Sequence, residues 1–220
     1  MLCPAGTNFP ACALVFSKKS SILETISRAF CSARARGAAS GRLCKKEHIT
    51  MKTGLILEGG AMRGMFTAGV LDVLMEHNII TDGAIGVSAG AVFGCNYKSH
   101  QIGRVIRYNT TYCNDKRYAS FRNLIRTGNL YSEDFCYHRV PDQLDPFDAE
   151  TFRASPMDFF VVATDLRTGE PIYHKCRTGD AEDVRWMEAS ASMPLAAKAV
   201  QIGHYALLDG GVADSIPVRF

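Results

Sequence analysis

The sequence lacks the features that mark membrane-spanning, secreted and zinc-binding proteins. Its apolar runs all fall short of the roughly 20 residues needed to cross a bilayer. No CxxC pair occurs among its eight cysteines, and none of their spacings suggests a metal site. The N-terminal segment also lacks the compact apolar stretch of a secretory signal. We therefore expect a cytoplasmic protein whose thiols are reduced.

The charge distribution excludes nucleic acid as an expected partner and divides the chain in two. Residues 1–50 carry a net charge of +6, whereas the remaining residues carry a net charge of −3. A mildly acidic body gives no electrostatic reason to bind nucleic acid. Residues 1–50 also show little hydrophobic periodicity. We predict that they form a basic, disordered extension outside the fold, as translated upstream sequence before a start at Met51 or as a targeting segment.

Residues 51–220 are predicted to form one domain with alternating strands and helices. Buried strands are expected at Thr53 to Leu57, Ala84 to Val87 and Asp158 to Ala163, with helices at Phe66 to His77 and Ala89 to Cys95. This alternation is typical of a parallel sheet covered by helices. Toward the C-terminus the pattern predicts a turn at Asp165 to Gly169 and a hairpin partner strand at Ile172 to His174. It also predicts a helix at Val184 to Ala191 and strands at Val200 to Ile202 and Tyr205 to Leu208.

The middle section, residues 98–157, is polar and rich in aromatic residues. A helix is expected from about Gln101 to Tyr108, followed by irregular structure that contributes to a substrate cleft or lid. Four aromatic residues in this section either line an acyl groove or anchor loops: Phe121, Tyr131, Phe135 and Tyr137.

The pentapeptide Gly86-Val87-Ser88-Ala89-Gly90 is the strongest single indication of chemistry. A G-x-S-x-G sequence is typical of a sharp strand-to-helix turn that exposes the serine oxygen at its apex. The glycines are needed because neighbouring backbone passes close to the turn. The sequence therefore predicts that Ser88 is the nucleophile of an acyl hydrolase.

A serine nucleophile needs a base, and the sequence points to a carboxylate. All six histidines precede Asp209, so the Ser–acid–His order of α/β-hydrolases is absent. Asp209-Gly210-Gly211 ends an apolar run, where a carboxylate can contact the serine directly. Its alternative interpretation is an ordinary Asp-Gly turn.

The glycine-rich stretch Gly59 to Gly64 favours an oxyanion hole over a phosphate-binding loop. It lies between a predicted strand and a predicted helix, where free backbone N–H groups can hold an anion. Ala61 breaks the G-x-G-x-x-G spacing, and no Gly-Lys-Ser/Thr ending follows. Arg63 either anchors this loop, meets an anionic head group, or is simply solvated.

Together, these three motifs resemble those of the patatin-like phospholipase family, its bacterial members above all. The resemblance runs from about Lys52 to Val218 and implies a three-layer α/β/α sandwich with a mainly parallel central sheet. It implies lipid-ester hydrolysis without metal or cofactor, and transient contact with a membrane surface. Carried over by motif, Ser88 is the nucleophile and Asp209 the proton acceptor. The oxyanion hole is formed by Gly59, Gly60 and Ala61, and the supporting residues are Arg63, Gly64, Gly86, Gly90, Gly210 and Gly211.

Two departures from the family pattern keep other functions open. Ala61 replaces the usual third glycine, and the chain ends soon after Asp209, so the C-terminal part of the domain is expected to be missing. The main alternative is an inactive lipid-binding or interaction protein that retains the fold. A nucleotide-binding α/β domain is a further alternative.

Overall fold

The structure is a computed structural model that describes residues 52–220, so the predicted extension over residues 1–50 lies outside the described residues. The strands are β1 (Gly54–Leu57), β2 (Gly83–Val87), β3 (Asp158–Asp165), β4 (Pro171–Cys176), β5 (Val200–Ile202) and β6 (Tyr205–Asp209). The α-helices are α2 (Gly64–Glu76), α3 (Ala89–Lys98), α4 (Arg104–Tyr112), α5 (Phe121–Thr127), α6 (Ala149–Ala154) and α7 (Ala181–Ser190). Two 3-10 helices, η1 (Ala61–Arg63) and η3 (Gly210–Val212), and the π-helix η2 (Phe135–Leu144) complete the set.

The central sheet is mixed. Strand order is β1-β2-β3-β6-β5, and β4 pairs with β3 as well. The predicted parallel pairing holds for β1 with β2 and for β2 with β3. Strands β4 and β6 both run antiparallel to β3, and β5 runs antiparallel to β6. The short turns after β3 and β5 account for the antiparallel pairs β3–β4 and β5–β6, because tight turns join antiparallel strands only.

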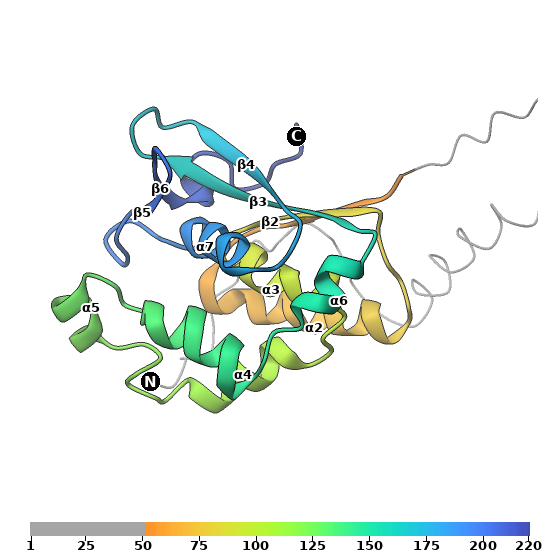
Figure 1. The fold of residues 1–220 in the computed structure, drawn as a ribbon, viewed down its shortest axis with the longest axis horizontal. Coiled ribbons are helices and arrows are strands. Elements are labelled where there is room, and N and C mark those ends of the chain that lie inside the picture. The colour runs from red at the N-terminus through yellow and green to blue at the C-terminus, as the bar shows by residue number, and fades with distance from the viewer. Residues whose placement is uncertain (1–51) are drawn as a thin grey trace, which may run out of the picture. The chain divides into compact units, whose positions relative to one another are not determined.

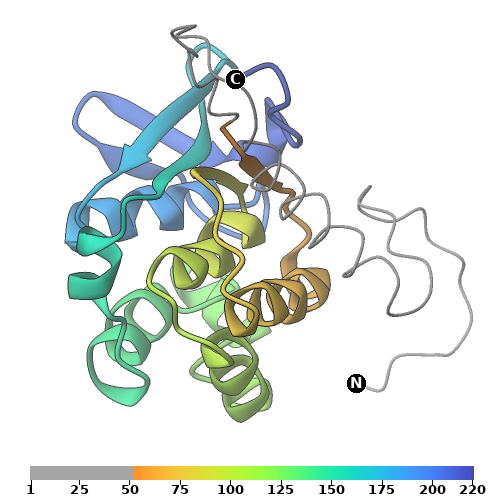
Figure 2. The same cartoon turned by 90° about the vertical axis from the view of Figure 1, so that its right-hand side faces the viewer.

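Alternating side chains of the central strands separate two apolar layers. Phe159, Val161 and Ala163 of β3 face the main core, against which α2, α3 and α7 pack (Figures 1 and 2). On the other face Val87 and Val162 belong to a smaller buried cluster. There η3 and the C-terminal segment cover the sheet, with Phe220 against two of its aromatic residues. The predicted α/β/α sandwich is confirmed, since both faces of the sheet are covered, but the sheet is mixed rather than mainly parallel.

Side-chain caps begin three of the helices that surround the sheet. Ser120, Asp148 and Asp180 accept hydrogen bonds from backbone N–H groups in the first turns of α5, α6 and α7 respectively. These donors have no intrahelical acceptor, so the caps fix where each helix begins. The predicted helix at Val184 to Ala191 therefore begins earlier, because Asp180 supplies the cap.

Most of the predicted elements are present with shifted ends. The strands expected before the two glycine motifs, and the hairpin strand after β3, are confirmed as β1, β2 and β4. The helix expected from Gln101 to Tyr108 begins instead at Arg104, because Gly103 adopts a left-handed conformation (φ 72°) before it. Beyond it lie the short α5 and η2, which the polar sequence did not reveal. Within residues 52–220, no helix combines the length and the apolar character needed to cross a bilayer.

Helix α3 lies unusually close to the sheet because two of its residues lack side chains. A Cβ on Gly90 would stand 2.1 Å from the carbonyl oxygen of Leu57, and one on Gly94 would stand 2.4 Å from the Leu57 side chain. No real Cβ fits at such distances, so the backbones of α3 and β1 meet directly. This contact sets the position of the N-terminus of α3 relative to the end of β1.

The close approach predicts a large penalty for one methyl group. Gly90→Ala should lower the free energy of unfolding by about 3 kcal/mol or more, because backbone atoms must move to admit the Cβ. Gly69→Ala in α2 is the matched control, since no atom lies within 4 Å of its added Cβ. It should stabilise the protein by up to about 1 kcal/mol. Equal stability of the two variants in urea unfolding would contradict the described packing.

Candidate functional site

Ser88 occupies a strained turn between β2 and α3. Its backbone has φ 54° and ψ −121°, a conformation that residues with a Cβ rarely adopt. The residue is the N-cap of α3, and its carbonyl accepts hydrogen bonds from Ala91 and Val92. The side chain is left at the helix N-terminus, beside a cavity that it helps to line. This is the strand-turn-helix geometry predicted for the G-x-S-x-G motif.

Gly86 is required by the same turn. A Cβ on Gly86 would lie 2.4 Å from the carbonyl oxygen of Gly90 and 2.6 Å from the amide nitrogen of Ala91. The chain therefore folds back so tightly that the residues on either side of Ser88 touch through backbone atoms. Both glycines of the pentapeptide, Gly86 and Gly90, thus have a steric role.

The register of the sheet places Asp209 beside the end of β2. Val87 pairs with Val162 of β3, and Asp209 pairs with the next residue, Ala163. Strand β6 therefore continues along β3 from the point at which β2 turns away at Ser88. Neighbouring strands lie about 4.8 Å apart. Two residues 121 positions apart in the sequence, Ser88 and Asp209, thus meet at one edge of β3.

The Asp209 carboxyl is buried and has few hydrogen-bond partners. Burial raises its pKa, against the opposing effects of hydrogen bonds from the Ser88 side chain and the Gly211 N–H. The Gly211 nitrogen lies 2.8 Å from Oδ1. Gly210 is needed here, since its Cβ would stand 2.1 Å from the Val162 carbonyl oxygen. A carboxylate with a raised pKa is a better proton acceptor than a free one.

The loop at residues 59–61 passes directly over Ser88. A Cβ on Gly59 would stand 2.8 Å from the Ser88 Cβ, so only glycine fits there. Gly60 and Ala61 have φ values of 150° and 48°, both unfavourable for a residue with a side chain. Ala61 therefore holds a strained conformation where glycine would be relaxed. Ala61 also lines the cavity beside Ser88.

Arg63 and Gly64 support this loop. The Arg63 N–H donates to the Gly60 carbonyl at 3.0 Å, and its guanidinium folds back over Gly60. This contact favours the interpretation of Arg63 as a loop anchor. Gly64 begins α2 against α3, because a Cβ there would stand 2.8 Å from the Phe93 ring.

Ser190, which the sequence did not single out for a role, holds the Ser88 turn from the other side. The Ser88 N–H donates to Ser190 Oγ at 2.9 Å. Ser190 is fully buried and ends α7, which packs against β3. The bond satisfies a backbone donor that the left-handed turn leaves outside regular secondary structure.

A largely apolar cavity of about 180 Å³ opens beside Ser88. Its wall comes from α3, α7 and the polar middle section, which confirms the expectation that residues 98–157 contribute to a cleft. Tyr131 and Tyr137 line it, whereas Phe135 is buried in the neighbouring core. Phe121 does neither, since its side chain is exposed to solvent.

Glu188 is a buried carboxyl group in the wall of this cavity. It lies on α7 with its side chain among apolar residues, and within residues 52–220 that side chain has no hydrogen-bond or ion-pair partner. Burial raises its pKa to about 7, the Glu133 carboxylate adds to the rise, and Arg185 opposes it. The sequence did not indicate Glu188, because a single buried glutamate on a helix looks the same in sequence as a solvent-exposed one.

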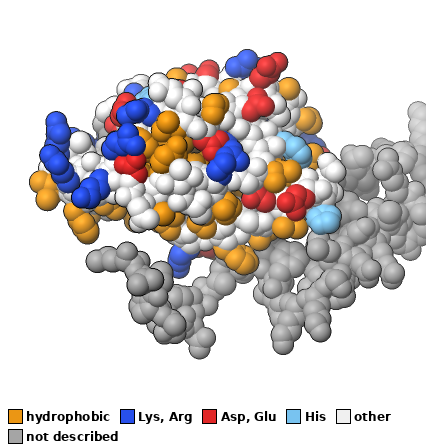
Figure 3. Space-filling model, turned by 90° about the horizontal axis from the view of Figure 1, so that it is seen from below, with side chains coloured by type: hydrophobic (Ala, Val, Ile, Leu, Met, Phe, Trp, Pro, Cys, Tyr) orange, Lys and Arg blue, Asp and Glu red, His pale blue; other side chains and the backbone are white. Residues whose placement is uncertain are grey.

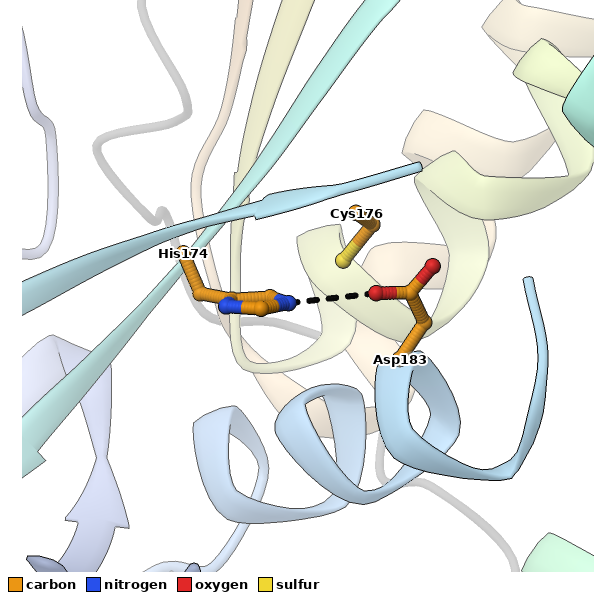
Figure 4. Close-up of side chains that lie close together, drawn as sticks. All are labelled: His174, Cys176 and Asp183. Carbon is orange, nitrogen blue, oxygen red and sulfur yellow. Dashed lines mark hydrogen bonds and ion pairs between the residues drawn. The ribbon is translucent and has the colours of Figure 1, made fainter. Parts of the chain in front are cut away.

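His174, Cys176 and Asp183 form a compact group on the edge of the sheet (Figure 4). His174 Nε2 lies 3.1 Å from Asp183 Oδ1, and its ring stacks on Trp186 at 4.3 Å. The other carboxylate oxygen accepts three backbone N–H groups from residues 177–179. Burial raises the pKa of Asp183, but these hydrogen bonds outweigh it and lower that pKa to about 2.

These contacts give the group a structural role. Asp183 joins the loop after β4 to α7. The contact with Asp183 and the stacking on Trp186 together fix the His174 ring. Neither His174 nor His204 is among the residues that line the cavity beside Ser88. The three side chains also carry atoms that could bind a metal, within 4.8 Å of one another. The spacing of the cysteines had not indicated this group.

A family-wide sequence comparison decides the family. The model of the family described as "Patatin-like phospholipase" matches residues 55–220, three quarters of the chain. The chain belongs to the patatin-like phospholipase family. The matched region contains the Ser88 turn, the loop at 59–61 and Asp209.

The chain is also similar to individual proteins. "Uncharacterized protein YjjU" of Escherichia coli is 30% identical over 174 residues, which cover 75% of this chain and 47% of YjjU. "Patatin-like phospholipase domain-containing protein ZK370.4" of Caenorhabditis elegans is 29% identical, over 74% of this chain and 12% of that protein. Among solved structures, VipD from Legionella pneumophila matches 76% of this chain and 47% of that chain, at 14% identity and a TM-score of 0.43. The chain thus spans about half or less of each relative.

The buried Glu188 predicts a pH dependence of stability. Its pKa is higher in the folded protein than in the unfolded chain, so the folded state binds the extra proton between about pH 4.5 and pH 7. Stability should therefore fall as the pH rises through this window, by about 1–2 kcal/mol after solvent screening. Glu188→Gln should remove this part of the decline in thermal unfolding measured from pH 5 to pH 8. Glu170→Gln, in the exposed turn between β3 and β4, should leave the slope unchanged; equal slopes in all three proteins would contradict the placement of Glu188.

Proposed function

We propose that this protein is a serine lipid acyl hydrolase that cleaves carboxylic esters through Ser88 and Asp209. One observation carries the proposal: β6 places a buried carboxyl group beside the strained Ser88 turn, next to an apolar cavity. Ser88 acts as nucleophile and Asp209 as proton acceptor, without a histidine, metal or cofactor.

In the first step the Ser88 oxygen attacks the ester carbonyl carbon, and Asp209 takes the hydroxyl proton. The raised pKa of Asp209 favours this transfer, because a more basic carboxylate accepts the proton more readily. The negative charge that develops on the carbonyl oxygen is stabilised by backbone N–H groups of Gly59, Gly60 and Ala61. Two observations support this role of the loop: its position over Ser88 and its strained backbone.

Collapse of the tetrahedral intermediate breaks the ester C–O bond. Asp209 returns its proton to the leaving alcohol or lysolipid, and the acyl group stays on the Ser88 oxygen. A water molecule then attacks the acyl carbon while Asp209 accepts one of its protons. Release of the fatty acid returns that proton to Ser88 and restores both residues.

The cavity favours a substrate with an apolar acyl chain. Its wall is formed mostly by aliphatic and aromatic side chains, among them Val92, Phe93 and Met187. Burial of a hydrocarbon chain there contributes about 25 cal/mol per Å² of apolar surface. Glu188 is the exception in this wall, and its pKa of about 7 makes it less charged near neutral pH than an ordinary glutamate. A fatty acyl chain therefore fits the lining better than a nucleotide.

Removal of the Ser88 hydroxyl should abolish hydrolysis while leaving the fold intact. Ser88→Ala should lower kcat for p-nitrophenyl butyrate by about a thousandfold or more. Its melting temperature should change little, because serine and alanine differ by one oxygen and share the same turn. Ser192→Ala, a buried serine in the same cavity wall, is the matched control and should keep most of the activity. Full activity in Ser88→Ala would contradict the assignment of Ser88 as nucleophile. The hydrolysis would then come from another group.

Removal of the Asp209 charge should be nearly as damaging. Asp209→Asn keeps the shape of the side chain but loses the proton acceptor, so kcat should fall by roughly 10²–10⁴-fold. The double variant with Ser88→Ala should be hardly worse than either single variant, since the two residues act as a unit. His174→Ala should retain activity. Full activity in Asp209→Asn combined with its loss in His174→Ala would show instead that a histidine is the base.

A further inference from the structure

Three large apolar side chains stand out on the surface near the cavity. Phe121 and Ile125 of α5 are 76% and 87% exposed, and Leu195 is 96% exposed at the tip of a loop. Phe121 and Ile125 are four residues apart, so they lie one above the other on the same face of α5. Leu195 has φ 68°, a strained conformation that holds its side chain out at the tip.

The two segments that carry these side chains lie side by side. Helix α5 is the tip of a hairpin over residues 119–131, closed by the bridge between Ala119 and Tyr131. At its base the Leu130 N–H donates to the Ala196 carbonyl at 2.7 Å. The Lys198 N–H donates to Asn129 Oδ1 at 2.8 Å. The hairpin and the loop at residues 193–198 therefore form one surface.

The same two segments form part of the wall of the cavity. Asn129, Leu130, Met193 and Ala196 all line it, and each is within a few residues of an exposed apolar tip. Phe121, Ile125 and Leu195 do not line it. The exposed side chains therefore lie on two segments that also form part of the cavity wall.

The apolar tips are surrounded by positive charge. Residues 116–131 include four basic and no acidic residues, and one of the four, Arg117, forms an ion pair with Asp115 just before them. Within residues 52–220, neither Arg122 nor Arg126 forms an ion pair, and both are exposed on α5. The acidic Glu133 and Asp134 follow the hairpin. Figure 3 shows blue and orange side chains together at the end that carries α5.

This combination matches the chemistry of an anionic bilayer surface. Apolar side chains on short loops can enter the boundary between head groups and acyl chains, and each nearby Lys or Arg adds attraction to anionic lipid. Helix α5 has seven residues, too few to span a bilayer, so it would lie in the boundary between head groups and acyl chains.

We propose that the α5 hairpin and the Leu195 loop dock this protein on anionic membranes with the Ser88 cavity facing the lipid. The benefit of docking rests on the proposed function, since it would let an acyl chain pass from the bilayer into the cavity without crossing water. The docking itself requires no catalysis and can be measured separately.

Sedimentation with vesicles tests the apolar tips. The full chain should bind vesicles of phosphatidylcholine with 30% phosphatidylglycerol. The variant Phe121→Ser/Ile125→Ser/Leu195→Ser should bind them at least about tenfold more weakly. Its hydrolysis of soluble p-nitrophenyl butyrate should be unchanged, because none of the three side chains lines the cavity. Ile80→Ser is the matched control, since Ile80 is 56% exposed and precedes the amino end of β2, whereas Ser88 follows the carboxyl end of the same strand.

Charge reversal tests the choice of lipid. Arg122→Glu/Arg126→Glu should abolish the preference for vesicles with phosphatidylglycerol over pure phosphatidylcholine, whereas Arg153→Glu on α6 should not. Unchanged vesicle binding in both sets of variants would overturn the proposal. A wild type that is dimeric, together with a triple Ser variant that is monomeric, would also overturn it. Vesicle binding by a wild type that hydrolyses no ester would support the docking surface and contradict only the proposed function.

Discussion

The whole site depends on the close backbone contact between α3 and β1. Gly90 lies so near the Leu57 carbonyl that α3 can begin only at one place, immediately beyond the end of β2. The chain reaches that place through the left-handed turn at Ser88. Because β1 is held against α3, the loop that follows β1 passes over the same serine. One packing contact thus fixes the nucleophile candidate and the candidate oxyanion loop together.

The change from parallel to antiparallel pairing supplies the second half of the site. A parallel neighbour in the place of β6 would begin where Asp209 now ends the strand. The antiparallel β6 instead brings its last residue to Ala163, where β2 has just left the sheet. The carboxyl group is then buried behind the serine, and burial raises its pKa. The antiparallel pairing of β6 with β3, which the sequence pattern did not predict, is therefore what joins Ser88 to Asp209.

Sequence reasoning found the features that depend on local chemistry. Gly86, Ser88 and Gly90 were recognisable because a strained turn needs glycine beside it, and β1 to β3 because buried strands are continuously apolar. Ser190 and Glu188 were not, since each acts through contacts made only after α7 has packed on the sheet. The α5 hairpin was also missed, because its exposed apolar side chains give no periodic core pattern.

The central claim is that the Ser88 turn presents an activated nucleophile to the cavity. An alkyl phosphonate ester that reacts with nucleophilic serines, followed by mass spectrometry of the digested protein, tests it most directly. The account predicts a single adduct on the peptide that contains Ser88, formed slowly or not at all in Asp209→Asn. An adduct on another residue, or equal labelling of Ser88→Ala, would contradict it.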